Sequence, residues 1–370
     1  MKFERMLIEA ESPEEYGYDR IKVNLAESAV RDRRLGDVNV QLDTQLLCYA
    51  DHLGYERLRA AIAAASDAPL SAQNVLVTAG AASALFYVAL TLLEHGDHLI
   101  VMRPNYATNI ATPNAIRCAV DYLDLQFAGG FRVDVDRLQR LLKPNTKLIS
   151  ITLPNNPTGV SLDADTLRQI VGLAERHGCR LLVDETYREM AFGTPLPVAA
   201  TLSDRAISVS SLSKTFGVPG IRIGWITSSD RRLLHELLCV KEQIAICGSV
   251  LDEYVGHAIY AARETWLPEN ARRIGAARST VERWLAGEPR MEWVVPDGGC
   301  VCFPRIKADA GIDVAQFHRR LIDDHGVFVG PGHWFERSDD YMRIGFGYPT
   351  PDELTQGLTA ISTALSASAR

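Results

Sequence analysis

The chain contains no run of about 18 uncharged apolar residues, the length that a membrane-spanning helix requires. Its first ten residues, MKFERMLIEA, lack the apolar core of a signal peptide, so we expect a cytoplasmic protein with no membrane partner. No long Lys/Arg run is present and the formal net charge is −7, which argues against a nucleic-acid partner.

Metal-binding and nucleotide-binding patterns are also missing. The seven cysteines are scattered, Cys300 and Cys302 have no second pair beside them, and the nine histidines follow no ligand spacing, so no metal is expected. An odd, dispersed set of cysteines is typical of reduced thiols in a cytosol. No small-residue turn ends in Gly-Lys-Ser/Thr or completes Gly-x-Gly-x-x-Gly, which argues against a Walker loop and a dehydrogenase.

What the chain does contain is a long alternation of apolar strands and helical patterns. Its 370 residues are 47% apolar and 23% charged, which suits a soluble globular protein with a large core. Expected strands are 75–78, 98–102, 119–123, 148–152, 180–184, 206–209 and 224–227, with helices such as 82–94 and 163–177 between them. Strands that are apolar throughout are buried on both faces, so we predict an α/β fold with a mainly parallel seven-stranded sheet flanked by helices.

The C-terminal part has a different pattern. A long helical stretch over about 230–282 leads to an expected strand pair over 293–303 around Gly298 and Gly299. Short strands at 327–329 and 341–344 and a terminal helix follow, which predicts a smaller α+β domain. We therefore divide the chain into an N-terminal segment 1–48 that joins the small domain, a large domain 49–250 and a small domain 251–370.

Lys214 is the most informative single residue. It lies among serines, glycines and apolar residues, directly after the expected strand 206–209. Partial burial disfavours the ammonium form and leaves a nucleophilic amine, which Schiff-base chemistry needs. Taken alone, a lysine is more often a solvated surface charge.

Two polar residues follow other expected strands. Asp184 closes strand 180–184, where a carboxylate must either cap the next segment or meet a cation, such as a protonated ring nitrogen. Tyr187, three residues later, is placed to reach the same ring. Asn156, in the segment LPNNPTG, belongs either to a plain turn or to an amide that donates to a ring oxygen.

Other segments suggest sites for anions and for a flat ring. The strand–turn–helix VTAGAAS around Ala81 and Ala82 exposes backbone N–H groups that suit a phosphate, although small residues there also serve helix packing. Ser211 and Arg222 are near enough in sequence to Lys214 to reach that phosphate. Tyr106 either stacks on a ring or packs in the core, and Arg343, inside an apolar strand, needs an internal salt bridge or a substrate carboxylate.

In combination, the segments 155–159 (NNPTG), 184–187 (DETY) and 211–214 (SLSK) with Arg222 resemble the class I/II aminotransferases. These are pyridoxal 5′-phosphate enzymes of the aspartate-aminotransferase fold, fold type I. The resemblance implies that Lys214 forms the internal aldimine and acts as the Cα proton base, while Asp184 pairs with the pyridine nitrogen. It also implies that Asn156 and Tyr187 bind the ring O3′.

The same resemblance implies that Tyr106 stacks on the cofactor ring. It assigns the phosphate to the amides of Ala81 and Ala82 together with Ser211 and Arg222. The side chains at 81–83 are less polar than those that many relatives place in this loop, so the backbone N–H groups must contribute more.

The family's substrate and partner contacts are implied as well. Arg343 would grip the α-carboxylate, with Asn156 and Ala26 beside the substrate, although the family often has glycine where this chain has Ala26. Members are usually homodimers, and Tyr49 matches the tyrosine that reaches the neighbouring subunit's phosphate. The sequence shows no obvious second arginine that would bind a substrate side chain. Nothing therefore marks the chain as an enzyme for aspartate or glutamate.

These residues predict an aminotransferase acting on an α-amino acid. They leave open a lyase that eliminates a β- or γ-substituent or cleaves a C–S bond. As further alternatives they allow a cyclase, decarboxylase or oxidase in natural-product biosynthesis, because relatives with the same residues share the chemistry up to proton removal at Cα. A non-catalytic effector-binding module is the remaining alternative, but the chain has no helix-turn-helix segment to accompany it.

Overall fold

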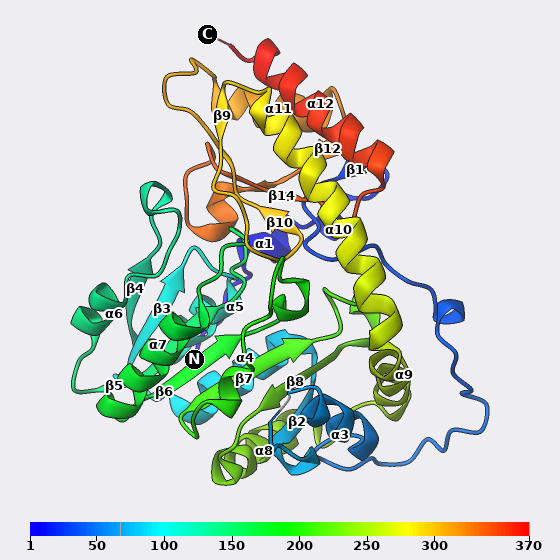
Figure 1. The fold of residues 1–370 in the computed structure, drawn as a ribbon, viewed down its shortest axis with the longest axis vertical. Helices are drawn as coiled ribbons and strands as arrows, with labels where there is room; N and C mark the ends of the chain where they lie inside the picture. Colours follow the sequence, from blue (N-terminus) through cyan, green and yellow to red (C-terminus); the bar gives the residue numbers. More distant parts are fainter. Residues whose placement is uncertain (67, 370) are drawn as a thin grey trace.

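Within residues 1–66 and 68–369, which the computed structural model describes, a seven-stranded sheet forms the centre of the larger region (Figure 1). Its strands are β2 (Val75–Ala79), β3 (His98–Arg103), β4 (Ala119–Asp124), β5 (Thr146–Thr152), β6 (Arg180–Asp184), β7 (Ala206–Ser211) and β8 (Ile223–Thr227). Their order is β2-β8-β7-β6-β5-β3-β4, and β8 is antiparallel to both of its neighbours while the other pairs are parallel. The predicted α/β class and the mainly parallel sheet are therefore confirmed.

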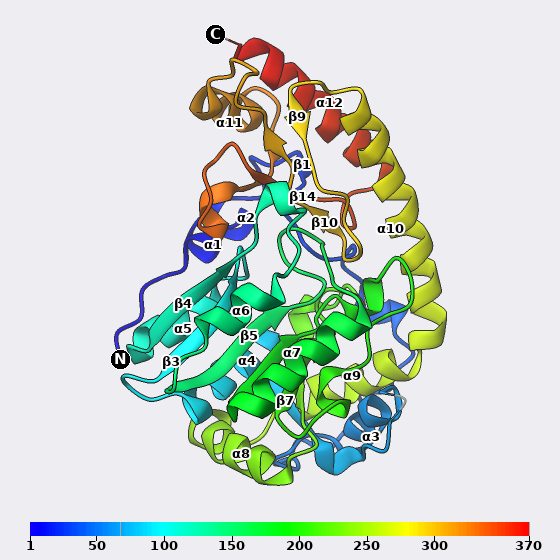
Figure 2. The ribbon, with the colours of Figure 1, turned by 60° about the vertical axis from the view of Figure 1, so that its left-hand side comes forward.

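Helices cover both faces of this sheet. The apolar sides of α4 (Gly80–Leu92) and α8 (Arg231–Ala245) pack on one face, with α5 (Thr108–Ile116) beside α4. The helices α6 (Val135–Leu141) and α7 (Ala164–His177) pack on the other, and Figure 2 shows them in front of the strands. At the β2 and β8 edge lie α3 (Glu56–Ala64) and α9 (Val250–Ala261).

The strand pleat decides which polar side chains reach the α4 face. In β6, Leu182 packs in the cluster with α4 and α8, whereas Val183 packs with α7. Because side chains alternate along a strand, Asp184 faces the same side as Leu182. In β7, Val209 packs on the α4 side, and Ser211 follows two residues later. Both strands thus end with a polar group on one face of the sheet.

A second region is built from short strands and long helices. Its strand pairs are β1 (Val23–Asn24) with β12 (Val327–Phe328), β9 (Met291–Glu292) with β11 (Arg305–Ile306), and β10 (Val301–Cys302) with β14 (Met342–Gly345), which also pairs with β13 (Gly330–Pro331). Its helices are α10 (Arg263–Ala286), α11 (Val314–Asp323) and α12 (Pro351–Ala367). Val23 and Leu25 pack with Phe317 and Leu358 in its core, so the N-terminal segment contributes to this region.

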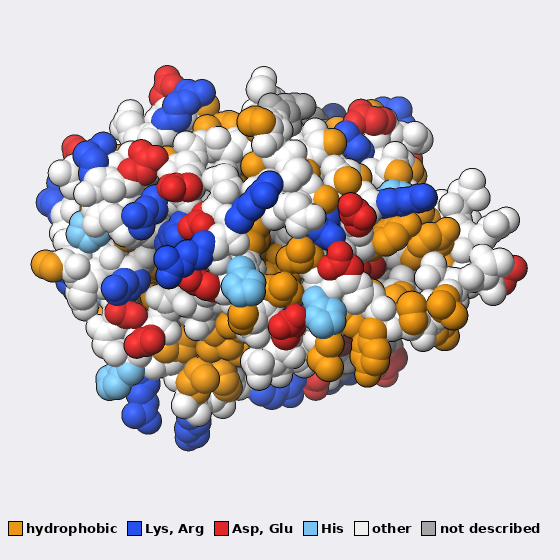
Figure 3. Space-filling view, turned by 90° about the horizontal axis from the view of Figure 1, so that it is seen from below, with side chains coloured by type: hydrophobic (Ala, Val, Ile, Leu, Met, Phe, Trp, Pro, Cys, Tyr) orange, Lys and Arg blue, Asp and Glu red, His pale blue; other side chains and the backbone are white. Residues whose placement is uncertain are grey.

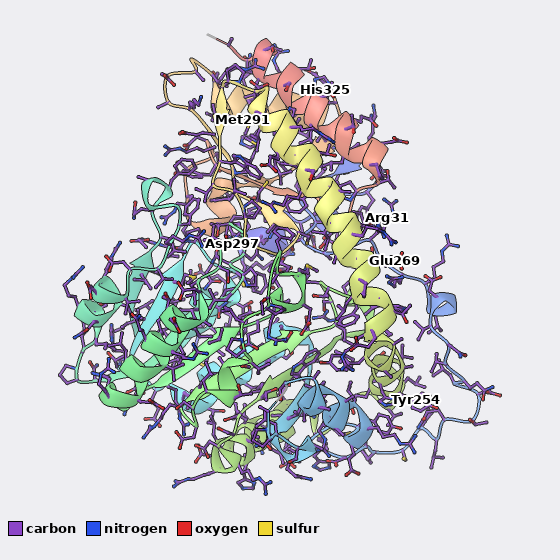
Figure 4. The ribbon with its side chains drawn as sticks, viewed as in Figure 1. Arg31, Tyr254, Glu269, Met291, Asp297 and His325 are labelled. Atoms are coloured by element: carbon purple, nitrogen blue, oxygen red, sulfur yellow. The ribbon has the colours of Figure 1, made fainter. Side chains whose placement is uncertain are left out.

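The two regions meet above the sheet. Asp297, labelled in Figure 4, lies at the junction of the two regions. It accepts hydrogen bonds from Arg132 at 2.6 and 3.1 Å. The short helices α1 (Leu7–Ala10) and α2 (Pro13–Tyr16) lie at the same junction (Figure 2). None of the helices in the described residues is long and apolar enough to cross a membrane. The domain boundaries at 48/49 and 250/251 remain predictions.

Two expected elements differ in the structure. The helical stretch over 230–282 is divided into α8, α9 and α10, because Ile246 adopts a φ of 54° after α8 and Ser249 caps the start of α9 through the amide of Asp252. Prediction of a strand pair around Gly298 and Gly299 is wrong, since β9 and β10 pair with β11 and β14 instead of with each other.

Gly298 permits a close approach between two segments and does not form a hairpin turn. A Cβ on Gly298 would lie 2.8 Å from the Pro154 side chain and 3.1 Å from the backbone of Ala191. The absent side chain therefore permits a close approach to the loop that follows β5, which brings the second region against the sheet.

Candidate active site

A cavity of about 240 Å³ lies where β5, β6 and β7 end. It is lined by the predicted site residues Ala26, Ala81, Ala82, Tyr106, Asn156, Asp184, Tyr187, Ser211, Lys214, Arg222 and Arg343. Helices α1 and α2 close one side of it through Ile8 and Pro13. Residues far apart in the sequence therefore converge at the carboxyl edge of a parallel sheet, the usual position of ligands in such folds.

Lys214 follows β7 and lies close to a carboxylate that the sequence analysis did not select. Its Nζ is 3.3 Å from Oε1 of Glu27, whose carboxylate also accepts the Ser28 amide at 2.8 Å. Burial disfavours the charge on Glu27, but the positive charges of Lys214 and Arg343 outweigh it and lower its pKa. Glu27 therefore remains ionised beside the amine.

Asp184 is a buried carboxylate without a cation. Asp184 is only 5% exposed. Its Oδ1 accepts hydrogen bonds from Thr186 N at 3.1 Å and from Thr186 Oγ1 at 2.6 Å. Burial raises the pKa of Asp184, although these two hydrogen bonds oppose the effect. Within the described residues no Lys, Arg or His pairs with it, so a protonated ring nitrogen in the cavity would supply the missing charge.

Arg222 and the start of α4 form a site suited to an anion. Gly80, the first residue of α4, has a φ of +79°, and a Cβ there would collide with the Arg222 guanidinium. Arg222 donates to the carbonyl of Pro219 at 2.8 Å and to Ser213 Oγ at 3.5 Å, and in the described chain it has no carboxylate partner. A cation beside a helix N-terminus favours a phosphate.

Arg343 also lines the cavity. It donates to Asn156 Oδ1 at 3.0 Å and to the carbonyl of Ala26 at 2.6 Å, while its Nε is buried without a partner in the described chain. Burial lowers the pKa of Arg343 from its ordinary value. A carboxylate bound here would satisfy the remaining N–H group.

The two predicted tyrosines hold protein groups in this structure. Tyr187 donates from its hydroxyl to the carbonyl of Ser28 at 2.8 Å, and burial raises its pKa well above the ordinary value. Tyr106 donates to Glu9 Oε1 at 3.1 Å, and burial raises the pKa of Tyr106 to about 12. Both phenols therefore stay protonated and can donate hydrogen bonds.

Tyr49 is the predicted site residue that does not line the cavity. It is 82% exposed on the loop before α3, which also exposes Leu46 and Leu47. Its predicted action on a neighbouring subunit stays a prediction.

Sequence reasoning missed three carboxylates that line the cavity, namely Glu9, Glu14 and Glu27. Glu27 follows Ala26 directly, so the segment VNLAES carried a signal, but a glutamate three residues after a two-residue strand has no distinctive pattern. Trp334, in the segment HWF, also lines the cavity.

Helix α1 is tied to the second region by a charged contact. His333 Nε2 lies 2.6 Å from Glu11 Oε2, and Trp334 Nε1 donates to the same oxygen at 2.8 Å. Asp339 Oδ1 is 2.8 Å from the other ring nitrogen. Burial alone would lower the pKa of His333, but the hydrogen bonds with Glu11 and Asp339 raise it. The contact fixes α1 across the cavity entrance.

Comparison with known proteins identifies the family. The profile described as "Aminotransferase class I and II" matches residues 20–361. The chain therefore belongs to this pyridoxal-phosphate-dependent family, as the motifs predicted.

Individual relatives point in two directions. The chain is 32% identical to the capreomycidine synthase of Streptomyces vinaceus, over 95% of this chain and 92% of that protein. A PLP-dependent aminotransferase from Streptococcus suis superposes with a TM-score of 0.92 at 27% identity, with 100% of both chains covered. A PLP-dependent cyclase superposes with a TM-score of 0.89 at 25% identity, covering 99% of this chain and 98% of that one.

The cavity fits pyridoxal phosphate. Among the described residues, the Asp184 carboxylate lacks a cation, Arg222 beside the start of α4 lacks an anion, and Lys214 supplies an amine in the same cavity. Asp184 would therefore suit a protonated ring nitrogen, Arg222 would suit the phosphate, and Lys214 would suit the aldehyde of the cofactor.

Proposed function

We propose that this protein is a pyridoxal-phosphate-dependent aminotransferase that moves the amino group of an α-amino acid to a keto acid. The convergence of Lys214, Asp184, Arg222 and Arg343 on one cavity carries the proposal. When bound, pyridoxal phosphate supplies an electron sink for the pair left at Cα after proton removal.

The chain's own groups would act at stated atoms. Lys214 Nζ takes the proton from Cα and later returns one, which requires the neutral amine. Asp184 keeps a proton on the ring nitrogen, since the buried carboxylate is most stable beside a cation. Arg343, held by Asn156, binds the α-carboxylate and thereby directs the Cα–H bond toward Lys214.

The test is a panel of amino acids given to the purified holoenzyme with and without a keto acid. We expect pyridoxamine phosphate to accumulate when the acceptor is absent, and a new amino acid to form when it is present. Ammonia release without an acceptor would contradict transamination and indicate elimination, or oxidation if oxygen is consumed.

Cyclisation is the second candidate, because both the relative named capreomycidine synthase and the cyclase structure match almost the whole chain. Lys214, Asp184 and Arg343 would have the same roles up to proton removal. The same panel separates the two reactions, since a cyclase returns its cofactor unchanged and its product keeps every nitrogen of the substrate.

We also propose a homodimer in which Tyr49 reaches the partner's phosphate. Apolar side chains are exposed on the loop before α3 and at the end of α8, including Leu46, Leu47, Ile244 and Ile246. A 2.6 Å contact between His52 and Glu242 joins these two segments. Figure 3 shows hydrophobic side chains gathered at several places on the lower face of the molecule, the end where α3 and α8 lie in Figure 1.

Light scattering of the holoenzyme should give twice the chain mass of 40.8 kDa. Replacement of Tyr49 by phenylalanine should weaken cofactor retention without changing that mass, because only the hydroxyl is removed. A monomer that retains the cofactor fully would contradict this arrangement.

A further inference from the structure

The cavity contains more negative groups than the cofactor and an amino-acid backbone require. Under the proposed function, Asp184 is used for the ring nitrogen. Glu9, Glu14 and Glu27 line the same cavity and have no assigned partner on the cofactor or on the substrate backbone.

The N-terminal glutamates differ according to the direction they face. Glu11 and Glu15, which lie outside the cavity, are paired with cations at 2.6 and 3.0 Å. Glu9 and Glu14, which line it, have no Lys, Arg or His partner in the described chain and accept only tyrosine hydroxyls at 3.1 and 2.9 Å. Of these four glutamates, the two that line the cavity are the two without a cationic partner in the described chain.

Glu14 contacts a phenol whose pKa also responds to Glu27. The Tyr18 hydroxyl donates to Glu14 Oε1 at 2.9 Å, and burial together with the charges of Glu14 and Glu27 raises the pKa of Tyr18. Glu9, by contrast, accepts from Tyr106.

Arg343 independently shows where an amino acid would bind. Only 4% exposed, it lines the cavity with an unpartnered buried Nε and donates to the carbonyl of Ala26, the residue before Glu27. A substrate whose carboxylate binds Arg343 and whose Cα faces Lys214 would have its side chain in the same cavity as Glu27 and Glu14.

Glu27 also needs a cation during the reaction. Lys214 is its nearest positive group, at 3.3 Å, and it must be neutral to accept the Cα proton. The other cation that acts on Glu27, Arg343, is used by the substrate carboxylate in the proposed function. A partly buried carboxylate that loses its nearest cation is destabilised, and a positive side chain on the substrate would replace that cation.

We propose that Glu27 and Glu14 form the side-chain subsite, and that the substrate is an α-amino acid with a cationic side chain, a guanidinium or an ammonium. The inference rests on the proposed function. A neutral side chain leaves both carboxylates unpaired, and an acidic one meets like charge, so the subsite selects by repulsion as well as attraction.

Titration of the holoenzyme, followed through the cofactor absorbance, gives apparent dissociation constants without turnover. L-Arginine is compared with its neutral isostere L-citrulline, and L-lysine with L-norleucine, while L-glutamate tests repulsion. We expect the cationic member of at least one pair to bind about 10- to 100-fold more tightly, the range for hydrogen bonds to a charged partner. The pair with the larger ratio identifies the guanidinium or the ammonium.

Matched variants locate the subsite. Glu14→Gln and Glu27→Gln should each reduce that ratio toward one, whereas Glu15→Gln, next to Glu14 in sequence but paired with Arg5 outside the cavity, should leave it unchanged. If the cationic and neutral members of both pairs bind equally, or if glutamate binds as tightly as the cationic amino acids, the proposed side-chain subsite is wrong. If no amino acid changes the cofactor absorbance, the proposed function itself fails.

Discussion

Lys214→Ala should lower turnover by at least about 10²- to 10⁴-fold, the range for removal of a general acid–base group. Loss of the covalent link to the cofactor adds to this effect. Borohydride followed by mass spectrometry should attach the cofactor to Lys214 in the natural protein and to no residue in the variant. The fold should persist, because Lys214 lines a cavity and does not belong to any of the apolar clusters.

Two controls separate the chemistry of Lys214 from its charge. Lys214→Arg keeps a cation beside Glu27 but provides no amine, so it should be as inactive as the alanine variant. Lys147→Ala, at an exposed position in β5, should leave turnover unchanged. Recovery of the cofactor on another lysine would show that the anchor is misassigned.

The sequence predicted the sheet well because its central strands are buried on both faces. In β6, for example, Leu181, Leu182 and Val183 are all buried, so a continuous apolar run marked the strand and its final residue, Asp184. The segments after these strands were then expected at one edge, and the structure places Asn156, Asp184 and Lys214 together there.

The second region was less predictable because its strands are only two to four residues long. Their pairing depends on contacts between distant segments, such as Val23 with Val327 and Cys302 with Ile344. The local sequence around Gly298 favoured a hairpin. In the structure this glycine instead permits the close approach to Pro154.

Glu27 illustrates why part of the site could not be found from the sequence. Its position beside Lys214 requires β1 to pair with β12 and the second region to close on the sheet. Glu14 reaches the cavity only because α1 and α2 lie across the entrance, where Glu11 is held by His333. Neither arrangement produces a local pattern of residues.

Asp184→Asn should separate stability from catalysis. Burial raises the folded-state pKa of Asp184 above its unfolded value, so the ionised carboxylate destabilises the cofactor-free fold as pH rises through that range. Asparagine is neutral and retains an oxygen for the two Thr186 hydrogen bonds. The cofactor-free variant should therefore have a melting temperature at pH 7 that is equal to or above that of the natural protein.

The catalytic rate of Asp184→Asn should fall even though its stability does not. The reason is that an amide cannot keep a proton on the ring nitrogen. We expect exchange of the substrate Cα proton with deuterated solvent to slow by on the order of 10²- to 10³-fold, as when a preorganised electrostatic group is lost. Cofactor content should fall far less, since Lys214 and Arg222 are unchanged. Equal losses of exchange rate, cofactor content and melting temperature would instead make Asp184 a structural carboxylate.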